Sequence, residues 1–187
     1  MIKHQYDLFG LNTHWKVLRY FCLHPSSEMY VNKVASELGL SAGMCSVVLR
    51  DLERIGIMSK RELGKAHYYR LVDNPMTRSL KRYIGLTLLD RSHLVQRITE
   101  RMPDTNSISL YGSFARGDFT EQSDIDILVI TNNRFNINLD DIVSEIGHEI
   151  SVETFSIGGW MKLKNNRDPF YMEVIMNHIV LYGAELP

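Results

Sequence analysis

The chain has 187 residues, which suits one medium-sized domain or two small ones, and 44% of them are hydrophobic, enough for a buried core. Its net charge of −1 hides an uneven distribution, because residues 1–103 contain 16 lysines and arginines against 9 acidic residues, whereas residues 104–187 contain 5 against 13. Neither a membrane-length apolar stretch nor a repeat is found, which argues against membrane-spanning and fibrous classes. We therefore expect a basic domain suited to a polyanion and an acidic domain suited to metal ions.

The basic half begins with a pattern typical of three short helices. The first is expected over residues 14–23, and the second over residues 34–38, after a short strand at residues 30–31. A third helix is expected over residues 41–55. Its apolar residues recur at intervals of three and four, which predicts a buried stripe. The stripe consists of Cys45, Val48, Leu52 and Ile55.

Two strands should follow at residues 57–63 and 66–71, joined by a hairpin turn at Gly64 and Lys65. This order of elements resembles the winged helix-turn-helix of small prokaryotic regulators. In that fold the start of the third helix reads the DNA major groove, and basic residues contact phosphates. The resemblance implies a set of DNA-contacting residues, namely Ser41, Ala42, Met44, Ser46, Arg50, Lys60, Arg61 and Lys65. The alternative is a winged helix used for protein contact or dimerisation.

Residues 75–101 indicate one long connecting helix, which begins at a proline and carries apolar residues in a heptad-like rhythm. Such a stripe is buried either against the chain's own two domains or against a second copy, and we favour a homodimer. The predicted organisation is an α+β chain with a winged helix-turn-helix domain at residues 1–74, a connecting helix at residues 75–103 and a second domain at residues 104–187. The second domain is expected to contain a mixed sheet with flanking helices.

The most informative motif lies in the acidic half, in the segment YGSFARGDFTEQSDIDILVI at residues 111–130. Gly112 and Ser113 follow an apolar strand, so backbone N–H groups and the serine hydroxyl can receive phosphate oxygens. Asp124 and Asp126 flank Ile125, and on a strand both carboxylates would point to the same side while Ile125, Ile127 and Val129 point into a core. Paired carboxylates at this spacing are hard oxygen ligands suited to Mg²⁺.

The Gly-Ser turn and the spaced Asp-x-Asp resemble the signature of the DNA polymerase beta superfamily of nucleotidyltransferases, and most closely its minimal prokaryotic members. The resemblance implies that Asp124 and Asp126 hold two metal ions. It also implies a third carboxylate on a neighbouring strand, for which Glu153 within residues 150–155 is the best match. Many relatives carry aspartate there, so Glu153 departs from the pattern by one methylene, and Glu149 is a weaker substitute. A half-exposed strand residue without a catalytic role is the alternative interpretation of Glu153.

Arg116 lies in the same segment and could bind the triphosphate, because its planar guanidinium matches phosphate oxygens. An equally good interpretation is that Arg116 pairs with Asp118 or Glu121 and braces the loop. The nucleotide-binding residues are thus expected to be Gly112, Ser113 and Arg116. Trp160, Phe170 and Tyr171 could stack on a base, but a core role is favoured at this spacing.

These observations predict an enzyme that transfers a nucleoside monophosphate from a nucleoside triphosphate to an acceptor hydroxyl, coupled to a winged helix that binds duplex DNA. The expected cofactor is Mg²⁺ or Mn²⁺, and ATP is the expected triphosphate. Two alternatives remain open. The transferase fold could serve as a nucleotide sensor in a transcription regulator, or the protein could be an antitoxin-like enzyme with a protein acceptor, as the resemblance implies. Cys22 and Cys45 fall on apolar helix faces, which favours a reducing cytoplasm.

Overall fold

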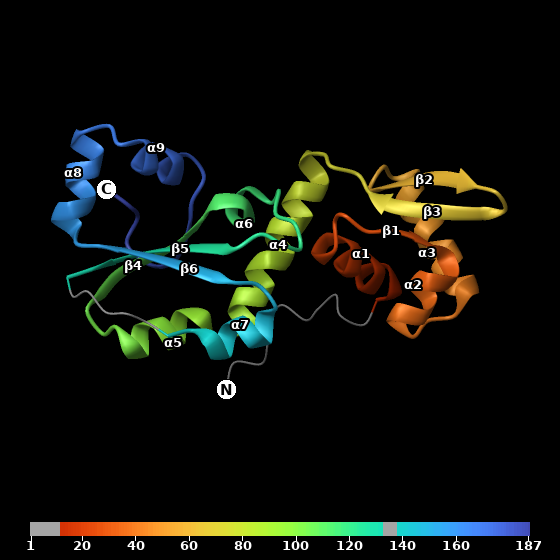
Figure 1. The fold of residues 1–187 in the computed structure, drawn as a ribbon, viewed down its shortest axis with the longest axis horizontal. Helices are drawn as coiled ribbons and strands as arrows, with labels where there is room; N and C mark the ends of the chain where they lie inside the picture. Colours follow the sequence, from red (N-terminus) through yellow and green to blue (C-terminus); the bar gives the residue numbers. More distant parts are fainter. Residues whose placement is uncertain (1–11, 133–137) are drawn as a thin grey trace. The chain divides into compact units, whose positions relative to one another are not determined.

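The computed structural model describes residues 12–132 and 138–187 and divides into two compact units, residues 1–84 and 85–187 (Figure 1). The division falls inside a single helix, α4 (Pro75–Arg91). This boundary lies within the segment predicted as the connecting helix, whereas the charge balance of the sequence was divided at residues 103 and 104.

From residue 12 to the start of α4, the N-terminal unit contains three helices and a small sheet. The sheet has the strand order β1-β3-β2, and both pairs are antiparallel. The hairpin turn falls at the two predicted residues, because Leu63 pairs with Ala66. The three helices and the hairpin predicted from the sequence are thus confirmed as elements. Their bounds are α1 (Thr13–Leu23), β1 (Glu28–Tyr30), α2 (Val31–Leu38), α3 (Ala42–Arg54), β2 (Met58–Leu63) and β3 (Ala66–Leu71).

Helix α3 begins where the sequence predicts, because the Ser41 side chain accepts a hydrogen bond from the Met44 amide at 3.2 Å. Its buried stripe is confirmed at Cys45, Val48 and Leu52. The prediction was wrong for Ile55, whose side chain is 58% exposed. Ile55 is the C-cap residue, so the chain leaves the helical path there and the three-four spacing no longer fixes its direction.

The connecting helix was predicted as one continuous helix, but the structure contains two, α4 and α5 (Leu94–Arg101). The break lies at His93, which has a left-handed backbone with φ of 54°. No glycine or proline marks this break, so the apolar rhythm runs through it unchanged. Ile84 and Ile98 are completely buried within the single chain. For these two residues, the structure agrees with packing against the chain's own units.

The C-terminal unit is built on a mixed sheet with the strand order β6-β5-β4-β7. Strand β4 is antiparallel to β5 and β7, whereas β5 and β6 are parallel because the chain crosses over through α7. The predicted mixed sheet is therefore confirmed. The elements are β4 (Thr105–Tyr111), α6 (Gly112–Arg116), β5 (Ile125–Thr131), α7 (Asp140–Ile146), β6 (Ile150–Phe155), α8 (Ile157–Asn165), α9 (Pro169–Met176) and β7 (Ile179–Gly183).

Helices cover both faces of this sheet, with α5 and α7 on one side and α8 and α9 on the other (Figure 1). Strand β5 is consequently buried on both faces, not only on the face of Ile125, Ile127 and Val129 as the sequence indicated. Leu128 and Ile130 pack with Trp160 and other aromatic residues from α8 and α9. The core role favoured for Trp160, Phe170 and Tyr171 is thereby confirmed.

Candidate nucleotide and metal site

The Gly-Ser turn and Asp126 meet because of the antiparallel pairing of β4 with β5, in which Tyr111 lies opposite Asp126. Gly112 immediately follows Tyr111 and has a φ of 67°. A Cβ atom at Gly112 would lie 2.0 Å from Oδ2 of Asp126. Glycine is therefore required at this position twice over, by the left-handed backbone and by the carboxylate that occupies the space of a side chain.

Asp124 and Asp126 lie on the same side of the chain, with Ile125 completely buried between them. Burial is the largest cause that raises the pKa of Asp126, and the negative charge of Asp124 raises it further. Arg116 lowers the pKa of Asp126 and opposes part of this effect. Two carboxylates that destabilise each other's charge are relieved by a cation between them, so this pair fits a divalent metal ion.

Glu153 occupies the same face of the sheet as Asp126 but stands two residues further along. In the parallel pairing of β5 with β6, Asp126 lies opposite Ser151, whereas Glu153 lies opposite Leu128. The Glu153 side chain is exposed. Within residues 12–132 and 138–187, no three acidic, histidine or cysteine side chains converge on one point as a ready-made metal centre. Asp124 and Asp126 thus form a two-carboxylate arrangement, with Glu153 nearby.

Tyr111 connects these carboxylates electrostatically. Its pKa is raised to about 12, first by burial and then by the charges of Asp126, Glu153 and Glu173. The phenol therefore keeps its proton across the physiological range and can act there as a hydrogen-bond donor. Asp126 and Glu153 both act on this hydroxyl, although they belong to different strands.

Arg116 ends the short helix α6 and is held by acidic residues. Its Nε donates to Oδ2 of Asp118 at 3.1 Å, and its Nη1 lies 4.0 Å from Oε1 of Glu173. The loop-bracing interpretation of Arg116 describes this contact with Asp118. A role in phosphate binding stays a prediction, supported by the position of Arg116 beside Asp126. The Ser113 carbonyl accepts hydrogen bonds from Gly117 and Asp118, which closes the turn.

Two residues at the site were not predicted from the sequence. Glu173 on α9 acts on the pKa of Asp126, whereas Glu153 is not among the causes of that shift. His148 contacts the segment that leads into Asp124. Neither residue belongs to the Gly-Ser or Asp-x-Asp pattern. No sequence signal marks Glu173, because it reaches the site through the packing of α8 and α9 on β5.

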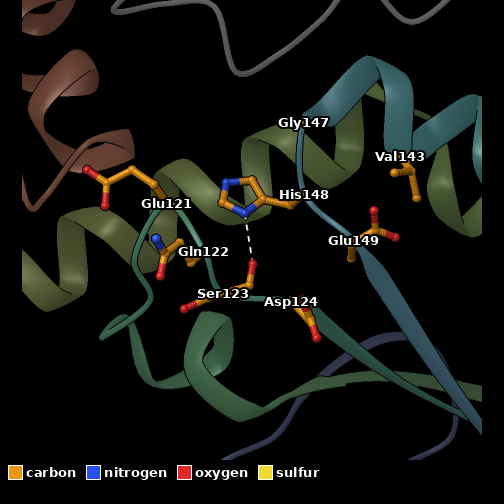
Figure 2. A pocket seen from close by; sticks show the side chains of 8 residues that line it. All are labelled: Glu121, Gln122, Ser123, Asp124, Val143, Gly147, His148 and Glu149. Atoms are coloured by element: carbon orange, nitrogen blue, oxygen red, sulfur yellow. Dashed lines mark hydrogen bonds between the residues drawn. The ribbon is translucent and has the colours of Figure 1, made fainter.

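A pocket of about 330 Å³ opens beside Asp124 (Figure 2). Residues that lead into β5 form one wall, and residues of α7 and the turn before β6 form the other. Glu149, the substitute candidate for the third carboxylate, lines this pocket. The lining residues are Glu121, Gln122, Ser123, Asp124, Val143, Gly147, His148 and Glu149.

The candidate DNA-contacting residues of the N-terminal unit are mostly exposed. Ser41, Met44 and Arg50 are exposed on α3, and Lys65 is exposed in the hairpin turn. Some basic side chains already have acidic partners. Arg61 donates through two nitrogens to Glu28, and Lys60 lies 3.6 Å from Glu62. No helix in the described part of the chain is long and apolar enough to cross a membrane.

Comparison with known proteins points to one family. Residues 92–180 match the family model of the nucleotidyltransferase domain. Two curated relatives from Methanocaldococcus jannaschii carry the name "Putative protein adenylyltransferase". One is 36% identical over 81 residues, which are 42% of this chain and 57% of the relative. The other is 54% identical over 33 residues, or 18% and 33% of the two chains. The chain therefore spans about half of one relative and a third of the other.

Among solved structures, the AntR antimony-specific transcriptional repressor is 21% identical, with 48% of this chain and 77% of that chain covered and a TM-score of 0.37. A likeness at this level assigns no function. The match to the family model includes both the Gly-Ser turn and the Asp-x-Asp strand. Residues 92–180, within the C-terminal unit, are thus similar to the nucleotidyltransferase domain and to part of the two relatives.

Proposed function

We propose that the C-terminal unit transfers AMP from ATP to a hydroxyl group of a protein, with a divalent metal ion as cofactor. The observation that carries this proposal is the pair Asp124 and Asp126 with Gly112 in contact with the Asp126 carboxylate. The family match supports nucleotidyl transfer, and the names of the two relatives support an adenylyl group and a protein acceptor.

Each residue of the candidate site has a proposed role in this reaction. Asp124 and Asp126 would hold Mg²⁺ or Mn²⁺, and Glu153 is the proposed third ligand. When bound, the metal would neutralise phosphate charge and lower the pKa of the attacking hydroxyl. Ser113 and Arg116 would orient the triphosphate. The acceptor oxygen then bonds to the α-phosphorus, the bond to the bridging oxygen breaks, pyrophosphate leaves, and a site carboxylate takes the hydroxyl proton.

A transfer assay tests this proposal directly. The protein is incubated with Mg²⁺, with ATP labelled on the α-phosphate, and with proteins encoded next to its gene as acceptors. We expect label on a protein band, and no label when Asp124 and Asp126 are both changed to Asn. Labelled GTP, CTP and UTP in parallel test the choice of base. Transfer by the double variant at the parental rate would contradict the assignment.

A non-catalytic nucleotide sensor is the second candidate for the C-terminal unit. It is favoured by the exposed Glu153, because no third side chain joins the Asp pair within the described residues. Both candidates require metal-dependent ATP binding, but only the enzyme releases pyrophosphate. Pyrophosphate release measured on the same samples therefore separates the two.

For the N-terminal unit we propose a winged helix that binds duplex DNA. The order α1-β1-α2-α3-β2-β3, the exposed start of α3 and the basic hairpin turn support it. We expect DNA affinity that falls steeply with salt, and Arg50→Ala with Lys65→Ala should reduce the slope by roughly one unit for each phosphate that is no longer bound. Unchanged DNA binding in this double variant would leave protein contact or dimerisation as the role of these residues.

A further inference from the structure

His148 is fixed to the residue before Asp124. It lies in the turn between α7 and β6, and its Nδ1 is 2.8 Å from the carbonyl oxygen of Ser123 (Figure 2). A carbonyl only accepts hydrogen bonds, so Nδ1 carries the proton in this contact. Nδ1 is a donor both in this neutral tautomer and in the doubly protonated ring, so the bond survives protonation of the imidazole.

The next residue in the turn holds the other side of Asp124. The carbonyl oxygen of Glu149 accepts a hydrogen bond from the Ile125 amide at 2.8 Å. The consecutive residues His148 and Glu149 thus bind the chain immediately before and immediately after Asp124. Because both flanking peptide groups are fixed, the backbone of Asp124 is held in one position even though its carboxylate is exposed.

The imidazole ring also contacts the segment that follows the Gly-Ser turn. It meets the Phe114 ring edge-on, with centroids 5.1 Å apart and an angle of 84° between the planes. Phe114 is stacked on Phe119 with a centroid distance of 4.0 Å, and Phe119 lies 6.3 Å from the imidazole. His148 therefore touches both halves of the motif: the residue after Ser113 and the residue before Asp124.

We propose that His148 is a positioning residue for the metal site, which fixes the backbone of Asp124 through the hydrogen bond to Ser123. This inference rests on the proposed metal-dependent function. Metal affinity rises when the ligands are held in place before the ion binds. Residues that orient a ligand from behind change metal affinity or activity by about 10- to 100-fold when they are replaced.

Three substitutions separate the hydrogen bond from the ring. In His148→Asn the amide nitrogen takes the place of Nδ1 and can still donate to Ser123. In His148→Gln the amide lies at the place of Nε2, so the bond is lost. His148→Phe keeps a ring against Phe114 but has no donor. We expect Mn²⁺ affinity close to the parent for His148→Asn, and about 10-fold weaker for His148→Gln and His148→Phe.

A matched control exists in the N-terminal unit. Nδ1 of His24 lies 2.8 Å from the Tyr20 carbonyl oxygen, and its ring stacks on Tyr20 at 4.4 Å. His24→Gln removes the same kind of hydrogen bond far along the chain from the metal site. We expect it to lower the melting temperature without any change in Mn²⁺ affinity.

The measurements are Mn²⁺ binding to the full chain by electron paramagnetic resonance, and hydrogen exchange at the Ile125 amide. Exchange should accelerate in His148→Gln and His148→Phe but not in His148→Asn. Parental Mn²⁺ affinity in His148→Gln and His148→Phe, or equal loss in all three variants, would overturn the positioning role. Asp126→Asn is measured alongside: if it too leaves Mn²⁺ affinity unchanged, it is the metal site itself that is wrong.

Discussion

The two strands that carry the candidate metal ligands lie side by side, yet they offer their carboxylates very different surroundings. Strand β5 is central and buried on both faces, and Asp126 is closed in by Gly112. Strand β6 is at the edge of the sheet, and Glu153 is exposed. Asp126 is half-buried and Gly112 restricts its carboxylate, whereas the exposed Glu153 keeps rotational freedom. Asp126 is therefore the preformed part of the proposed site, whereas the exposed Glu153 is held less firmly.

The largest effect should come from removing the preformed part. Asp124→Asn together with Asp126→Asn takes two charges from a site that neutralises phosphate through a divalent ion, so the loss should amount to several kcal/mol of binding free energy. We expect no measurable binding of Mg²⁺ with ATP by calorimetry. Equal nucleotide affinity in the double variant and the parent would show that Asp124 and Asp126 do not hold the metal ion and the nucleotide.

Gly112→Ala should break the same part of the site without touching a ligand. The new methyl group would collide with the Asp126 carboxylate, so we expect metal affinity and transfer to fall by about 10²-fold, the scale for a displaced ligand. Gly39→Ala is the matched control, because Gly39 has a similar φ of 59° and no atom within 4 Å of an added Cβ. It should reduce stability by about 1 kcal/mol and leave metal affinity unchanged. Equal metal affinities in the two variants would mean that the Gly112 contact has no role in ligand placement.

Glu153 provides the contrasting test on the edge strand. Glu153→Gln should leave nucleotide affinity nearly intact, because Asp124 and Asp126 are still present, while kcat falls by about 10²-fold, or roughly 3 kcal/mol. Glu153→Asp should keep measurable activity. Glu149→Gln, four residues earlier in the chain, is the control and should have the parental kcat. If Glu149→Gln lost activity and Glu153→Gln did not, the third-ligand assignment would move to Glu149.

The sequence predicted the parts of the site that depend on local order, and missed those that depend on packing. Gly112 and Asp126 could be predicted together because a strand, a turn and a second strand follow one another, and antiparallel pairing brings them together. Glu173 could not, because it reaches the site through the packing of α8 and α9 on β5. The break at His93 was also missed, since only a left-handed backbone marks it. The predicted burial of Ile55 was wrong for a related reason, because helical spacing fixes the direction of a side chain only within the helix.

The smallest effect concerns the metal-free protein, and it has the opposite sign. Burial and Asp124 raise the pKa of Asp126 above its usual value, so its charged form destabilises the folded state at neutral pH. Asp126→Asn removes this charge, and we expect the melting temperature of the metal-free variant to be higher than that of the parent.

As the pH falls through the raised pKa of Asp126, the parent takes up a proton and recovers this stability. The difference in melting temperature should therefore shrink and vanish below about pH 4, the usual range for an aspartate. Glu153→Gln, which removes one exposed acidic charge on the neighbouring strand, is measured in parallel. Thermal denaturation of both variants and the parent without metal, from pH 3 to pH 8, measures the effect. A lower melting temperature for Asp126→Asn than for the parent at pH 7 would contradict this prediction. It would show that the charged Asp126 stabilises the metal-free fold.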